Sequence, residues 1–208
     1  GPGGGAALAA VLRGGGCPAL TELLVWGNGL GDAGFGALAE ALGRGACPGM
    51  AKLHAVNNGL TVLPEALCGV ASLEELGLRS NDIGSLPHGL LHLTRLRVLG
   101  IDGNPRLAAE AEIVGGISGD NVGALFAHLR SVHGGEPPPF DADAAAAADA
   151  ARVDEPTHLD AAALRARVRE AGAGTLKLDG STGPASSDAG PGTRGGAARA
   201  GAAAAGGA

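Results

Sequence analysis

The sequence predicts an α/β fold in which short parallel strands stack into a repeat solenoid, followed by a helical and then disordered C-terminal tail. Residues 73–83 and 96–107 both follow the pattern L-x-x-L-x-L-x-x-N, with a further apolar residue after the asparagine. Matched positions such as Leu76 and Leu99 are 23 residues apart. The same spacing relates residues 63–70 to residues 86–93 outside the strands, so whole structural units repeat.

Each L-x-L core is expected to form a short strand, because the side chains of a strand alternate between its two sides. Leu76 and Leu78 then point into the core, and Leu99 and Ile101 do the same one unit later. A single unit buries only one side, so neighbouring units must stack. The asparagine that ends each strand can bond backbone groups of adjacent turns, and four are in register: Asn28, Asn58, Asn81 and Asn104.

The first part of the chain has a longer period, since residues 8–20 match residues 38–50 at an offset of 30. This length leaves room for a helix, which we expect to open at Gly31 with Asp32 as its N-cap. Three apolar residues of this segment fall on one helical face: Phe35, Leu38 and Leu42. Residues 1–5 are expected to be flexible because four of the five are glycine.

The composition excludes several classes of protein. The net charge is −6 and no basic cluster occurs, which argues against a nucleic-acid surface. No apolar run is long enough to span a membrane, and the N-terminus lacks the features of a signal peptide. Glycine makes up 39 of 208 residues, far above the usual ~7%.

Because the chain starts inside a repeat without methionine, we expect it to be part of a longer protein.

These motifs resemble those of the leucine-rich repeat superfamily. Residues 20–53 are similar to its ribonuclease-inhibitor class, and residues 60–107 to the class found in Ras-binding scaffolds and plant intracellular Ras-group-related proteins. The resemblance implies a right-handed solenoid with a parallel sheet on its concave face. It also implies protein binding, although members of the superfamily have very diverse partners.

We therefore predict three segments: a solenoid over residues 1–133, a linker over 134–180, and a disordered Gly/Ala-rich tail over 181–208. The solenoid should end in a helix whose apolar stripe contains Val122, Leu125, Phe126, Leu129 and Val132. In the linker, Thr157 and Asp160 resemble a capping box that opens a helix. Residues 175–180 are similar to a stray repeat strand, and residues 158–180 as a whole resemble the entry of a second array.

The candidate binding site is formed by strand residues that alternate away from the core. They make three rows across the expected sheet: Glu22, Lys52, Glu75 and Val98; Leu24, His54, Gly77 and Gly100; Trp26, Val56, Arg79 and Asp102. Tryptophan and arginine are frequent interface anchors, so we expect a binding face with an apolar end around Trp26 and a charged end around Arg79. The alternative is that these charges only pair with one another, Arg79 with Asp102 and Glu22 with Lys52.

Other reactive residues favour structural roles. Cys17, Cys47 and Cys68 lack metal-ligand spacing and are expected to be buried thiols, which suits a reducing cytosol. His88 and His92 lack a third ligand and are expected to be solvated. Asp141, Asp143 and Asp149 lie in an alanine tract and are also expected to be solvated. We predict no catalytic residue, no metal and no cofactor.

The sequence thus favours a non-enzymatic, cytoplasmic interaction module that binds a protein partner on its concave sheet, with no nucleic-acid or membrane contact. By resemblance only, we expect a signalling scaffold or a regulator of a small GTPase. The alternative is a ligand-sensing or substrate-adaptor part of a larger receptor or ubiquitin-ligase protein.

Overall fold

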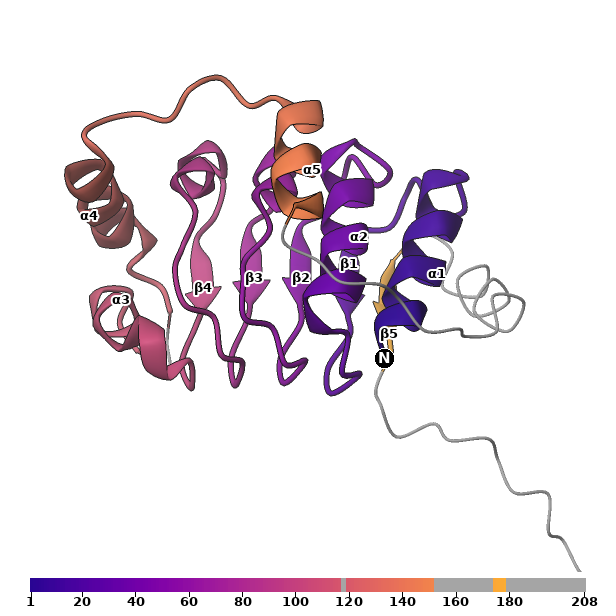
Figure 1. The fold of residues 1–208 in the computed structure, drawn as a ribbon, viewed down its shortest axis with the longest axis horizontal. Coiled ribbons are helices and arrows are strands. Elements are labelled where there is room, and N and C mark those ends of the chain that lie inside the picture. The colour runs from indigo at the N-terminus through magenta and orange to yellow at the C-terminus, as the bar shows by residue number, and fades with distance from the viewer. Residues whose placement is uncertain (117–118, 152–173, 179–208) are drawn as a thin grey trace, which may run out of the picture.

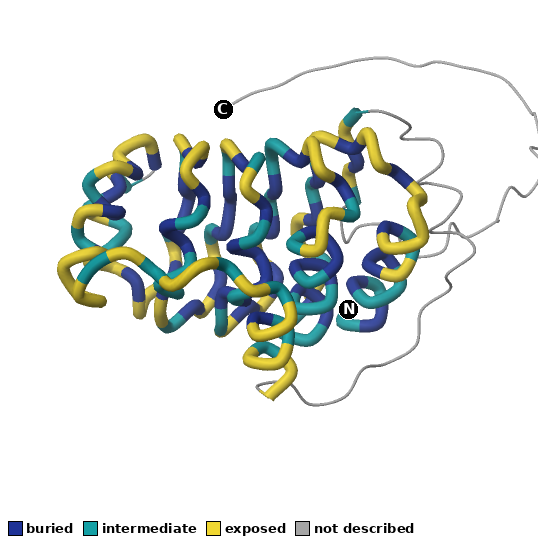
Figure 2. The backbone as a smooth tube through the Cα atoms, turned by 90° about the horizontal axis from the view of Figure 1, so that it is seen from above, coloured by how far each residue is buried: buried dark blue, intermediate teal, exposed yellow. Residues whose placement is uncertain are grey.

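The computed structural model describes residues 1–116, 119–151 and 174–178, and these form a mixed α/β fold. Five short strands make one sheet in the order β4-β3-β2-β1-β5, and every pairing is parallel. Figures 1 and 2 show α1, α2 and α5 on one face of this sheet. The helix expected from Thr157 and the tail over 181–208 lie outside the described residues.

Each strand is three residues long. The strands are β1 (Glu22–Leu24), β2 (Lys52–His54), β3 (Glu75–Gly77), β4 (Val98–Gly100) and β5 (Thr175–Lys177). The α-helices are α1 (Pro2–Arg13), α2 (Gly31–Gly43), α3 (Ala108–Ile113), α4 (Val122–His133) and α5 (Ala142–Ala150). Three 3-10 helices also occur: η1 (Glu65–Gly69), η2 (His88–His92) and η3 (Pro105–Leu107).

The spacing of the sequence repeats sets the register of the sheet. Leu76 pairs with Leu99, which follows it by 23 residues, and Leu23 pairs with Leu53 across the longer first period. All four leucines have no exposed surface. The inward residues of successive strands therefore form continuous buried rows between the sheet and the helices, as Figure 2 shows in dark blue.

The asparagines bond the turns that follow the strands. Asn58 Oδ1 accepts the backbone N–H groups of Asn28 and Leu30, while its amide donates to the carbonyls of Val25 and Val56. Asn81 and Asn104 repeat this arrangement, and all three of these side chains are buried. Because one amide supplies both donors and acceptors, each asparagine satisfies backbone groups that have no partner within their own turn.

The expected flexibility of residues 1–5 is wrong, because α1 begins at Pro2. Glycine has a low intrinsic helix propensity, but here it permits a close approach between two helices. A Cβ atom at Gly5 would lie 2.3 Å from the carbonyl oxygen of Gly34 in α2. Packing of Gly5, Leu8 and Leu12 against the rest of the core therefore outweighs the low propensity of the segment.

Asp32 does not act as the predicted N-cap, since that position is held by Leu30 and Asp32 lies in the first turn of α2. Its carboxylate instead accepts three hydrogen bonds from the next unit. The donors are the backbone N–H groups of Thr61 (2.8 Å) and Val62 (3.2 Å) and the Thr61 hydroxyl (2.5 Å). Asp32 thus joins two successive units, which a purely local analysis of helix ends does not detect.

Strand β5 lies at the opposite end of the sheet from α4. It pairs in parallel with β1, and Leu176 joins the buried row beside Leu23. Backbone bonds hold both of its ends, from Thr21 N and Glu22 N to Gly174 O and from Leu178 N to Leu24 O. The segment predicted to be a stray strand therefore covers the β1 edge of the sheet, as Figure 1 shows.

Helix α4 covers the core next to β4 (Figure 1). Four of the five predicted stripe residues are buried, namely Val122, Leu125, Phe126 and Leu129. Val132 is not, because 63% of it is exposed in the last turn of the helix.

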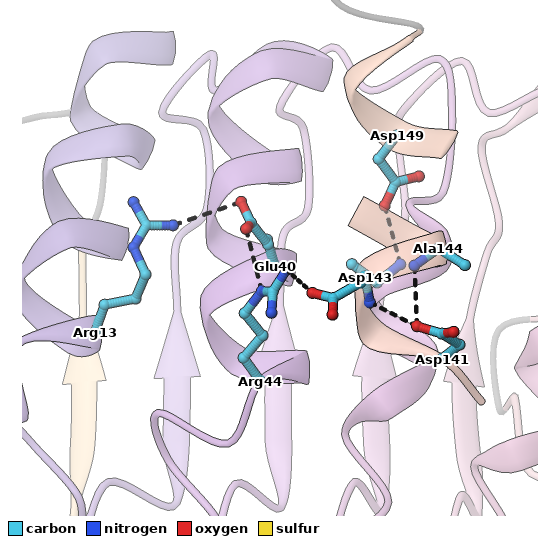
Figure 3. Close-up of polar contacts among 8 residues, drawn as sticks. Arg13, Glu40, Arg44, Asp141, Asp143, Ala144 and Asp149 are labelled. Atoms are coloured by element: carbon cyan, nitrogen blue, oxygen red, sulfur yellow. Dashed lines mark hydrogen bonds and ion pairs between the residues drawn. The ribbon is translucent and has the colours of Figure 1, made fainter. Parts of the chain in front are cut away.

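The three aspartates expected to be solvated have specific partners around α5 (Figure 3). Asp141 caps α5 by accepting the N–H groups of Asp143 and Ala144, which lowers the pKa of its carboxyl. Asp149 accepts the backbone N–H groups of Glu65 (3.0 Å) and Ala66 (2.9 Å) at the start of η1. Asp143 forms an ion pair of 2.7 Å with Arg44, the residue that follows the last residue of α2. These contacts attach α5 to the helical face of the sheet.

His88 and His92, which were expected to be solvated, are half-buried and have ring partners. The ring of His88 stacks on His133 with centroids 4.6 Å apart, and its Nε2 lies 3.0 Å from the carbonyl oxygen of Gly135. His92 meets the edge of Phe140 at 6.0 Å. Both histidines therefore contact the segment that joins α4 to α5.

Candidate functional site

The candidate site is the sheet face opposite α1, α2 and α5, and we refer to it as the open face. The strand register places the first two predicted rows on it, because Glu22 pairs with Lys52 and then Glu75 with Val98. The third row follows directly after the strands, where backbone hydrogen bonds between neighbouring units continue. Residues of these rows alternate with fully buried ones in β1 and β2, whereas in β3 and β4 the row residues Gly77 and Gly100 are themselves buried. The open face is thus a continuous surface made by four consecutive units and extended by β5.

Trp26 is the most exposed apolar residue of this face. It is 48% exposed, and it is the single tryptophan of the chain. Leu24 and Val56 are partly exposed, and the ring of His54 lies 6.2 Å from that of Trp26 at an angle of 31°. An exposed indole supported by neighbouring side chains has both the area and the restricted conformation of an interface anchor.

The charged residues of the predicted rows pair with one another. Lys52 Nζ lies 3.1 Å from Glu22 Oε1, His54 Nε2 lies 2.9 Å from Glu75 Oε1, and Arg79 Nε lies 3.2 Å from Asp102 Oδ2. The Arg79–Asp102 and Glu22–Lys52 pairs are those named in the alternative interpretation of the sequence. Each pair links neighbouring strands, and because they are partly solvated their contribution to stability is small.

Two glycines of the second row give these side chains room to lie on the sheet. A Cβ atom at Gly77 would be 3.0 Å from the His54 ring, and one at Gly100 would be 3.0 Å from Arg79 Nε. His54 thus lies over Gly77, and Arg79 lies over Gly100. Polar side chains therefore cover the glycines at the β3–β4 end of the face, whereas the β1 end carries the exposed Trp26.

Sequence reasoning missed two residues of the open face, Thr175 and Lys177 of β5. Thr175 Oγ1 lies 2.6 Å from Glu22 Oε2, and this hydrogen bond, followed by the one with Lys52, lowers the pKa of the Glu22 carboxyl. Lys177 pairs in register with Leu24. The alternation Thr-Leu-Lys-Leu indicated a strand, but nothing in the sequence indicated which edge of the sheet it would join.

The three cysteines are buried and form no disulfide. Burial raises the pKa of the Cys47 thiol to about 11 and also raises the pKa values of Cys17 and Cys68. Cys47 Sγ lies 3.3 Å from the carbonyl oxygen of Cys17, its counterpart one unit earlier. A nucleophilic or metal-binding cysteine needs a stabilised thiolate, and these surroundings favour the neutral thiol.

Comparison with known proteins assigns no family, since no protein-family model matches the chain and no curated protein matches it significantly. Within residues 1–116, 119–151 and 174–178, no group of three or more potential ligands could hold a metal ion. In the same ranges, no helix combines the length and apolar character needed to cross a membrane.

Proposed function

We propose that this protein is a leucine-rich repeat solenoid that binds a protein partner through the open face, as a non-enzymatic interaction module. The observation that carries the proposal is the position of Trp26, which is 48% exposed beside Leu24 and Val56 on the open face. The repeated strand register and the asparagine bonds between turns support the solenoid. A scaffold or regulator in signalling is the role we favour.

The charges support binding more than catalysis. General acid–base chemistry needs a carboxyl or imidazole poised in a pocket, whereas Glu75 and His54 bond each other on a solvated sheet. We further propose a cytoplasmic location, because three buried cysteines without a disulfide suit a reducing compartment.

The test compares the full chain with two variants that each remove one exposed apolar side chain. Trp26→Ala acts on the open face, and Val132→Ala acts on α4 at the far end of the molecule. Each protein is immobilised, exposed to a native lysate, and the recovered proteins are quantified by mass spectrometry. Circular dichroism checks that both variants are folded.

We expect Val132→Ala to recover the same partners as the wild type. Trp26→Ala should lose about 2 kcal/mol or more of binding free energy, as for a central aromatic anchor. Equal recovery by folded Trp26→Ala and wild type would overturn the proposal that this face binds the partner.

A further inference from the structure

We propose that β5 completes the binding surface and that Lys177 binds an acidic group of the partner, which presents this group beside an apolar side chain. The inference deepens the proposed function and rests on it. It assigns a binding role to a segment far from the repeats in sequence, and it gives the partner a definite chemistry: a peptide segment that combines an aliphatic or aromatic side chain with a nearby carboxylate.

The position of Lys177 is held by contacts on both sides of it. Leu176 is only 4% exposed and packs in the core, so the alternation of the strand turns Thr175 and Lys177 to the open face. Leu178 N donates to Leu24 O at 2.6 Å, and its own carbonyl accepts a hydrogen bond of 2.6 Å from the Asn28 amide. The backbone around Lys177 is therefore anchored to β1 and to the turn that follows it.

The charges of the open face distinguish Lys177 from its neighbours. The other charged side chains of the rows have partners: Lys52 and Arg79 form ion pairs, and Glu75 lies at hydrogen-bond distance from the His54 ring. Lys177 is exposed, and among the described residues it has no ion-pair partner. An exposed cation therefore lies next to Leu24 in register. Trp26 follows Leu24 by two residues, just beyond the end of β1.

This juxtaposition selects a partner by charge as well as by shape. A partner that presented only an apolar side chain would pack against Trp26, Leu24 and Val56 without contacting Lys177. A carboxylate placed next to that group would also meet the ammonium of Lys177, whereas a basic group would be repelled. Complementary charge at the rim of an apolar contact mainly determines specificity and association rate, so the effect should weaken as salt concentration rises.

The experiment selects peptides from a phage-displayed random library on the immobilised 208-residue chain, then titrates the synthetic peptides in solution. Trp26 is the single tryptophan and the chain has no tyrosine, so its emission reports on this face. We expect the enriched peptides to carry Asp or Glu within a few residues of a large apolar side chain. Calorimetry gives the affinity of Trp26→Ala, which lacks the fluorescent reporter.

The variants separate the charge of Lys177 from general electrostatics. Lys177→Glu should weaken binding by at least about tenfold, while Lys177→Arg should remain within about twofold of the wild type. Arg95→Glu is the matched control, because it makes the same charge change at an exposed position in the turn before β4. Asp179 lies outside the described residues, so the series is repeated with Asp179→Asn, and the same dependence on Lys177 is expected.

The outcomes distinguish this inference from the proposed function. Peptides that need Trp26 but bind Lys177→Glu as well as the wild type, or that show no acidic enrichment, would overturn the inference and leave the proposed function standing. Peptides whose affinity is unchanged in folded Trp26→Ala would overturn both. A library that yields no binder would also overturn the inference.

Discussion

The side-chain oxygen of Asn81 accepts the backbone N–H of Asn58 at 2.9 Å. Asn58, Asn81 and Asn104, one in each of three successive turns, thus form a ladder in which each asparagine side chain bonds the preceding turn. The Asn81 oxygen also accepts the N–H of Leu60 at 3.1 Å, and the amide donates to the carbonyls of Ala55 and Leu78. Asn81 is 7% exposed, so water cannot easily replace these bonds. One side chain thereby supports backbone groups of two successive units.

Replacing Asn81 by alanine should therefore be costly. Asn81→Ala leaves several buried backbone groups without partners, and each costs about 1–3 kcal/mol. We expect a loss of at least about 2 kcal/mol in the free energy of unfolding, measured by urea denaturation. Asn57→Gly is the control, because Asn57 is exposed and has a φ of 54° that glycine adopts without strain. A loss as small as that of the control would show that the ladder is not needed for stability.

The buried leucine row is expected to be equally sensitive. Leu76→Ala or Leu99→Ala should lower the free energy of unfolding by roughly 2–5 kcal/mol, since both side chains are fully buried. Val132→Ala also removes an apolar side chain, but from an exposed site, so its effect should be within about 0.5 kcal/mol. Urea melts that show a similar small change for all three variants would contradict the assignment of these leucines to the core.

The attachment of α5 should depend on Asp149 more than on Asp143. Asp149 binds two backbone N–H groups of η1, while the Asp143–Arg44 ion pair is solvated, with 85% of the Asp143 side chain exposed. Hydrogen exchange measured by mass spectrometry should show reduced protection of residues 65–69 and 142–150 in Asp149→Ala. Asp143→Ala should change protection much less, because exposed ion pairs contribute little. The reverse order would show that the ion pair holds the helix.

The cysteines should react slowly while the protein is folded. With a pKa of about 11, only about one Cys47 in a thousand is a thiolate at pH 8. We expect the native protein to resist a thiol-specific reagent at pH 8 and all three cysteines to react in denaturant. In the folded protein the pKa of Cys47 lies above its ordinary value of 9.0, so burial of the neutral thiol stabilises the fold fully below pH 9. That stabilisation is lost as the pH rises toward 11, because the unfolded chain then gains more thiolate than the folded one. Rapid labelling of the native chain would contradict the buried environment.

The sequence by itself determined which residues form the strands and how neighbouring strands pair. Leu76 and Leu99 occupy equivalent positions 23 residues apart, and the sheet pairs them directly. Such local periodicity is sufficient because each unit contacts its nearest neighbours, and the burial of one leucine requires the burial of its counterpart. The same logic predicted that Glu22 and Trp26 would not point into the core.

Only the tertiary structure decided the contacts between segments that share no period. Leu176 joins the edge of β1 because parallel pairing satisfies backbone groups there, and the six-residue motif over residues 175–180 does not specify that edge. Gly5 forms part of a helix because α2 approaches closely enough to exclude a side chain, which overrides the local preference of a glycine run. Asp149 and Lys177 acquire their surroundings in the same way. Their partners lie more than 80 residues away in the chain, so the physical cause is the packing of the fold rather than the residues beside them.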